Sequence, residues 1–81
     1  MTPLAEYLEN NPDVTAKTIG ERMAKHMGQT PSSSSLSQWR TGLTAPNAAC
    51  QLAMAKATNN KVTPTDWVRW SAARRQTVKR G

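Results

Sequence analysis

A run of hydroxyl and amide side chains between Ser32 and Thr41 holds the groups in this sequence best suited to hydrogen-bonding chemistry. Gln38 can donate and accept at once, and a glutamine amide pairs with the edge of adenine through two such bonds. Serine hydroxyls bind bases or phosphates with little selectivity. Arg40, close to Gln38, carries the positive charge that attracts phosphate. The run therefore predicts a surface that contacts a polar, anionic partner.

The rest of the sequence contains no residue pattern typical of a catalytic or metal-binding site. His26 and Cys50 are the only histidine and cysteine, whereas a structural zinc site needs about four such ligands. A serine with His26 and either Asp13 or Asp66 would be needed for a catalytic triad, and no motif surrounds these residues. The sequence also has no glycine-rich phosphate-binding loop. We expect no enzyme activity, no metal and no cofactor.

The charge is divided unevenly along the 81 residues. Residues 1–21 carry one lysine against four acids, a net charge of −3, whereas residues 22–81 carry ten basic residues against Asp66 alone, a net charge of +9. The overall charge of +6 and the isoelectric point near 10.3 indicate a polyanionic partner. Composition alone leaves DNA, RNA and an acidic lipid surface open, as well as a role of the charge in solubility only.

Neither a membrane span nor a secretion signal is predicted. The sequence has no run of about 18 apolar residues, and Met1–Asn10 carries acids rather than the basic start of a signal peptide. A single cysteine forms no internal disulfide. We therefore expect a cytoplasmic protein with one small domain and a thin core.

The composition favours short helices over strands. Phenylalanine is absent, β-branched residues do not cluster, and proline and glycine separate segments rich in alanine, leucine, methionine and lysine. We predict an all-α domain over residues 1–76 and a basic C-terminal tail at Thr77–Gly81. About five short helices are expected, at Pro3–Glu9, within Thr15–Met27, at Pro31–Arg40, at Pro46–Thr58, and from Pro64 to about Arg74–Gln76.

Helix starts and ends carry characteristic residues. Gly28 can end the second helix in a left-handed cap, and Gly42 ends the third. The candidate N-caps are Thr2, Thr18 (in a possible capping box with Glu21) or its rival Thr15, Thr30, and Thr63, to which Asp66 can return a hydrogen bond.

Leu36 and Trp39 lie three residues apart in the third predicted helix and should face the core together, which leaves the opposite face to solvent. The serines of Ser32–Ser35 have low helix propensity, so a flexible linker is the alternative there. The run is short, however, and continues directly into Leu36. Trp67 and Trp70 share a face of the last helix and are interpreted either as core residues or as a dimer contact.

Several segments of the chain follow one another in an order that resembles the Cro/repressor helix-turn-helix family, most closely its YdaS-like branch in phages and prophages. The resemblance covers about residues 15–70 and implies a lambda-repressor-like fold. In that fold the second helix of the unit enters the major groove of DNA. The segments are Met23-Ala24-Lys25-His26-Met27-Gly28, Leu36-Ser37-Gln38-Trp39-Arg40-Thr41-Gly42, Pro46, Ala55-Lys56-Ala57-Thr58 and Val62-Thr63-Pro64-Thr65-Asp66-Trp67.

Two features depart from the family pattern. Gly28 and Trp39 are eleven residues apart, more than is usual in the family. Either the turn is longer, or the reading helix starts later than Pro31. Gly20 stands where the family often has a glutamine that contacts backbone phosphate, so that contact is not carried over to this chain.

The resemblance implies double-stranded DNA as the partner and a reading helix at about residues 32–40. Gln38 is the sharpest candidate for base readout, with simple solvation as its alternative. Stabilisation of the helix end is the alternative for Arg40, and the basic residues of the tail could follow the DNA backbone. The candidate contacts are Ser32, Ser33, Ser34, Ser37 and Gln38 for the groove, and Arg40, Thr41 and Lys17 or Lys25 for phosphate.

The expected function is sequence-specific repression of transcription by a homodimer bound to a near-palindromic operator, in a bacterial host cell and at its nucleoid. A dimer is expected because one short helix reads too few base pairs. The rival reading is an antitoxin that binds a toxin and represses its own operon. A helical RNA-binding adaptor is a third hypothesis, although the exposed candidates include no stacking aromatic residue.

Overall fold

The structure, a computed structural model, describes residues 1–80, with side chains as far as residue 73. Among these residues it contains helices and no strand. The predicted all-α fold with five helices is therefore confirmed. The helices are α1 (Pro3–Asn10), α2 (Ala16–Met27), α3 (Ser33–Thr41), α4 (Ala48–Ala57) and α5 (Pro64–Arg80).

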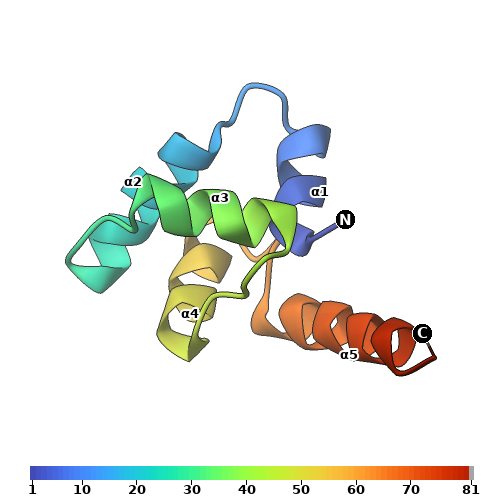
Figure 1. Cartoon of the computed structure of the whole chain (residues 1–81). Helices are drawn as coiled ribbons and strands as arrows, with labels where there is room; N and C mark the ends of the chain where they lie inside the picture. Colours follow the sequence, from blue (N-terminus) through green and yellow to red (C-terminus); the bar gives the residue numbers. More distant parts are fainter. Residues whose placement is uncertain (81) are drawn as a thin grey trace.

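The helix α3 rests on two others. It packs against α1 and α2, while α2 also packs along α4, and α5 contacts both α4 and α1. Figure 1 shows α3 crossing α2 at one end and reaching α1 at the other. Most of the packing of α3 is therefore against helices that precede it in the chain.

The core is made of apolar side chains from all five helices. Ile19 and Met23, two members of the predicted α2 stripe, are fully buried, and Met27 is half-buried against them. Trp67 is 1% exposed and fills the core, which confirms the first of its two interpretations. Trp70 is half-buried and meets Trp67 edge to face, with ring centroids 5.7 Å apart.

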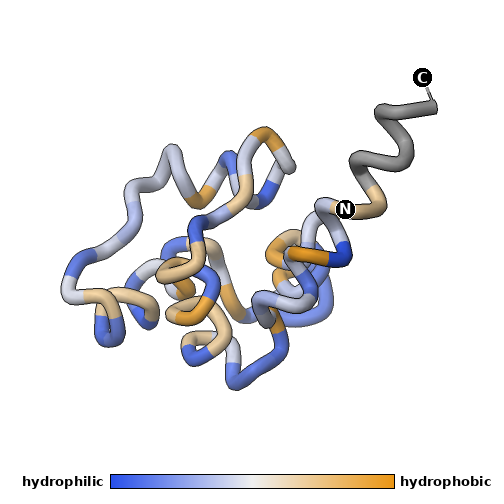
Figure 2. The backbone as a smooth tube through the Cα atoms, turned by 90° about the horizontal axis from the view of Figure 1, so that it is seen from below, coloured by the Kyte–Doolittle hydropathy of each residue, from blue (hydrophilic) through white to orange (hydrophobic). Residues whose placement is uncertain are grey.

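Hydrophobic positions are interspersed with hydrophilic ones along the described chain. Figure 2 shows short apolar stretches separated by polar ones, with no continuous apolar segment. Within the described part of the chain, no helix combines the length and the apolar character that crossing a membrane requires.

Three predicted N-caps are confirmed. The hydroxyl of Thr2 accepts a hydrogen bond from the amide three residues on, at 3.1 Å. Thr15, rather than its rival Thr18, caps α2, because its Oγ1 accepts from the Thr18 amide at 3.2 Å. Thr63 and Asp66 form a reciprocal capping box: Asp66 Oδ2 accepts from the Thr63 amide at 2.9 Å, and Thr63 Oγ1 accepts from the Asp66 amide at 3.3 Å.

The predicted start of the third helix is wrong. Ser32 caps α3 and Thr30 does not, so Pro31 lies in the turn and not in the first helical position. The reason is tertiary: a Cβ built on Gly20 would lie 3.6 Å from Thr30 Cγ2 and 3.9 Å from Pro31 Cδ, so these residues lie against α2. The helix starts later than Pro31, and the turn from Gly28, which has the predicted left-handed φ of 83°, is correspondingly long.

Boundaries of three other helices also need correction. Asn47 caps α4 by accepting a hydrogen bond from the Cys50 amide at 2.9 Å, so α4 begins after Pro46 and ends one residue before Thr58. The first helix extends one residue beyond Glu9. The last helix continues to Arg80 and does not end at Arg74–Gln76, so residues 77–80 of the expected tail are helical.

Part of the prediction for the C-terminal end lies outside what the structure describes. Gly81 is not described, and neither are the side chains of Arg74, Arg75, Lys79 and Arg80.

The hydroxyl of Thr2 joins two helices. It accepts from the amide of Ala5 in α1 and donates to the backbone carbonyl of Arg40, in the last turn of α3, at 3.1 Å. Thr2 is 3% exposed, so water does not replace these bonds. The ring of Trp70 packs against Gly42 next to Thr2. A Cβ built on Gly42 would lie 3.2 Å from this ring. The C-terminal end of α3 is thus held by α1 and α5.

Replacing Thr2 by valine should destabilise the domain by about 1–3 kcal/mol, since the change removes a cap and leaves a carbonyl without its partner. Urea unfolding measures this loss. Thr2→Ser keeps the hydroxyl and should lose clearly less. Equal losses in the two variants would show that the hydroxyl is not the stabilising group.

Candidate nucleic-acid interface

The helix α3 has one buried face and one exposed polar face. Leu36 and Trp39, at 5% and 7% exposure, point into the core, as their spacing predicts. Because each residue turns the helix by about 100°, the side opposite to these two holds Ser34 and Thr41, with Ser37 and Gln38 about equally far to either side. Ser34, Ser37 and Thr41 are exposed, and so are Ser33 and Arg40 at the margin of the face.

Ser32 has a structural role within the predicted contact set. Its hydroxyl accepts a hydrogen bond from the Ser35 amide at 3.1 Å and donates to the Ser35 hydroxyl at 3.0 Å. It is exposed at the N-terminal end of α3 but is already engaged in capping. Of the serines proposed for groove contacts, Ser33, Ser34 and Ser37 are the ones on the exposed helical face.

Gln38 lies at one edge of the polar face and is half-buried. Its Oε1 accepts a hydrogen bond from the hydroxyl of Thr44 at 3.2 Å. Thr44, in the loop after α3, was not among the predicted site residues. Its threonine type offered a weak signal, but only the folding back of this loop brings it to Gln38.

Arg40 and Thr41 occupy the C-terminal end of the polar face. Both are exposed. The Thr41 hydroxyl donates to the backbone carbonyl of Gln38 at 3.3 Å. The cationic side chain of Arg40 stands at the negative end of the α3 dipole, which favours it there. Its exposure also leaves the guanidinium accessible to an external anion.

The two lysines predicted to contact phosphate lie on different sides of α2. Gly20 marks the side that faces α3, because a Cβ on it would come within 2.9 Å of Leu36 Cδ1. At about 100° per residue, Lys17 lies roughly 60° from Gly20 around the helix and Lys25 roughly 140° from it. Both are exposed. The structure therefore brings Lys17 to the flank nearer α3 and sets Lys25 on the side away from it.

Gly20 itself serves the packing of α2 on α3. It is buried, and its missing side chain allows the close approach of Leu36. A larger residue at this position would require the end of the Leu36 side chain to move. The structure thus gives a packing reason for glycine at a position where the family often has glutamine.

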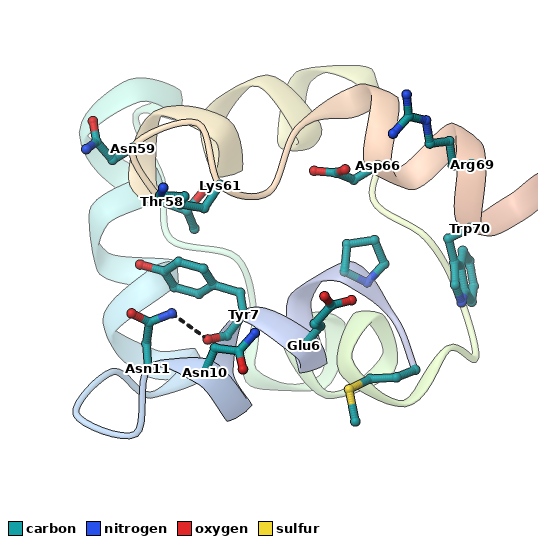
Figure 3. Close-up of a pocket in the computed structure, with 12 residues that line it drawn as sticks. Glu6, Tyr7, Asn10, Asn11, Thr58, Asn59, Lys61, Asp66, Arg69 and Trp70 are labelled. Carbon is teal, nitrogen blue, oxygen red and sulfur yellow. Dashed lines mark hydrogen bonds between the residues drawn. The ribbon is translucent and has the colours of Figure 1, made fainter.

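A groove of about 780 Å³ lies between α1, the turn after α4, and the first turns of α5. Figure 3 shows Glu6 and Tyr7 on its α1 side, with Asp66 and Arg69 contributed by α5. Its lining mixes acids and bases, and none of the predicted DNA contacts lines it. This mixed charge is unsuited to a polyanion, so the polar face of α3 is the better candidate site.

The remaining reactive groups do not form a site in the described part of the chain. Cys50 is buried, and desolvation raises the pKa of its thiol, against a smaller lowering by the hydrogen bond with Asn47. The thiolate is therefore disfavoured at neutral pH. His26 is exposed at the end of α2, and the described residues contain no cluster of potential metal ligands.

Comparison with known proteins adds no relative. A scan against protein-family models and searches among curated proteins and solved structures returned no match for this chain. The resemblance to the Cro/repressor family therefore stays a prediction based on the residues quoted above, and the proposals below are argued from the geometry of α3.

The capping role of Ser32 can be tested by stability alone. Ser32→Ala should cost about 1 kcal/mol, whereas Ser32→Asp should retain stability because aspartate is as good an N-cap and its charge suits the helix end. Thermal or urea unfolding reads out both. Ser33→Ala, at the neighbouring exposed position, is the matched control and should change stability by less than about 0.5 kcal/mol. A neutral Ser32→Ala would contradict the assignment.

Proposed function

We propose that this chain is a sequence-specific DNA-binding repressor of the phage and prophage Cro type, with α3 as the helix that enters the major groove. The observation that carries the proposal is the exposed polar face of α3, held outward by Leu36 and Trp39. A helix of nine residues with small hydroxyl side chains on its outer face fits the width of a major groove.

The charges around this face support a duplex as the partner. Arg40 and Lys17 are exposed, one at the end of α3 and one near the start of α2 on the flank nearer α3. Exposed cations on the reading helix and on the helix packed against it are suited to contact backbone phosphates. The net charge of +9 over residues 22–81 supplies the long-range attraction.

We propose that the protein acts as a homodimer on a near-palindromic operator. One α3 spans only a few base pairs, whereas two copies placed one helical turn apart multiply the specificity. Occlusion is the proposed mechanism, in which the dimer covers the operator and blocks polymerase. The proposed setting is the cytoplasm of a bacterial host, at the nucleoid.

Selection of bound sites from random duplexes, combined with sedimentation of the complex, tests this proposal. We expect an enriched motif with two half-sites about 10 base pairs apart and two chains per site. A single half-site with one chain would refute the dimer. The absence of any enriched motif would reject sequence-specific repression.

A second test compares two substitutions that remove one positive charge each. Arg40→Gln should weaken binding to operator and random DNA alike and should reduce the slope of log K against log salt by about one unit. Lys61→Gln, in the turn after α4 and on the lining of the groove, should leave that slope unchanged. If both variants changed the slope equally, net charge and not the position of Arg40 would explain the affinity.

A further inference from the structure

The backbone carbonyl of Gln38 is the point on which the loop after α3 folds back. It accepts hydrogen bonds from the amides of Gly42 at 2.9 Å, Leu43 at 3.0 Å and Thr44 at 3.5 Å. Gly42 makes this reversal with a φ of 92°, in the left-handed region that favours glycine. The position of Thr44 relative to Gln38 is therefore set by backbone geometry.

The same loop also engages the side chain of Gln38. The Thr44 hydroxyl donates to Oε1 at 3.2 Å, so one lone pair of the amide oxygen is occupied before any ligand arrives. The amide nitrogen, Nε2, keeps two hydrogens that it can donate. Thr44 is exposed and Gln38 is half-buried, so the bond lies at the surface, and while it is made it sets the orientation of the Gln38 amide.

We infer that Thr44 is a positioning residue that holds the Gln38 amide with its oxygen toward the loop and its N–H donors toward the major groove. This inference rests on the proposed function. Gln38 then reads a hydrogen-bond acceptor on a base edge, namely purine N7, guanine O6 or thymine O4. The two-bond contact with adenine suggested by glutamine alone is replaced by recognition in which donation from Nε2 dominates.

Preorganisation is the physical reason for such an arrangement. A free glutamine side chain samples many rotamers, and ordering it on binding costs conformational entropy. An amide already held by Thr44 loses less conformational entropy when it binds a base that matches its orientation. A base that presents only a donor at that position meets another donor, which disfavours it.

The experiment measures discrimination, defined as the ratio of affinities for the selected site and for the same site with the contacted base exchanged for cytosine, which presents a donor at its N4. Thr44→Val keeps the shape and removes the hydroxyl, and should reduce this ratio about 3- to 10-fold, as expected for one hydrogen bond. Thr44→Ser should restore it. Thr65→Val, at an exposed position in the first turn of α5, is the matched control and should leave it unchanged.

Two further variants separate positioning from direct contact. In a Gln38→Ala background, Thr44→Val should cause no additional loss, because there is no amide left to position. An equal loss in that background would show that Thr44 contacts DNA itself and would overturn the inference. Gln38→Glu keeps an acceptor for Thr44 but presents an acceptor outward, and should shift the preferred base from a purine toward cytosine.

The hydrogen bond between Thr44 and Gln38 can also be tested in the absence of DNA. In nuclear magnetic resonance spectra of the free protein, Thr44→Val should shift the Gln38 side-chain amide signals, and Thr65→Val should not. If no motif is selected from random DNA, the proposed function fails and the role in base readout fails with it, even where this shift is seen. If a motif is selected and Gln38→Ala reduces discrimination but Thr44→Val does not, only the positioning role fails.

Discussion

Burial of Leu36 and Trp39 is the constraint on which the rest of the candidate site depends. Two apolar side chains three residues apart fix the rotation of α3 about its own axis, so every other position on the helix is oriented by them. The ends are then held separately. At one end Gly20 lets α2 approach Leu36 closely, and at the other the Thr2 hydroxyl binds the last turn. The polar face is thus oriented by contacts that involve none of its own outward groups.

The core in which Leu36 and Trp39 are buried is small, so single contacts contribute noticeably to the free energy of unfolding. A domain of 81 residues buries a limited fraction of its surface, and 1 or 2 kcal/mol is a large part of the roughly 5–15 kcal/mol of a typical unfolding free energy. Thr58 is buried but its hydroxyl is satisfied by the Met54 carbonyl and the Val62 amide. Trp67 Nε1 is buried without a partner among the residues whose side chains are described, which is the cost of filling the core with so large a side chain. Stability and the pose of α3 are therefore coupled in this domain.

The fold could be predicted where the signal is local. Thr2 before a proline and the Thr63–Asp66 pair define helix starts within four residues, and both starts are as predicted. The start of α3 could not be predicted in this way, because Thr30-Pro31 and Ser32 are both good local candidates. In the structure Thr30 and Pro31 lie in a turn that packs against Gly20. Gly20 is thirteen positions before Ser33 in the sequence, so a rule based on local capping residues does not include this contact. Propensity also failed to predict the end of α5, which continues to Arg80.

The site shows the same division between local and tertiary information. Helical periodicity predicts which side of α3 faces outward, and Ser33, Ser34, Ser37, Arg40 and Thr41 are all exposed. The hydrogen bond between Thr44 and Gln38 could not be predicted, because it requires the left-handed turn at Gly42 and a Gln38 carbonyl that accepts hydrogen bonds from several amides of the loop. This difference changes the chemistry of the face. Hydroxyl groups rotate and accept or donate as the base demands, so they discriminate little. In the proposed complex an amide held by its oxygen adds a directional donor among adaptable hydroxyl groups, and further specificity would come from DNA shape and from the spacing of two copies.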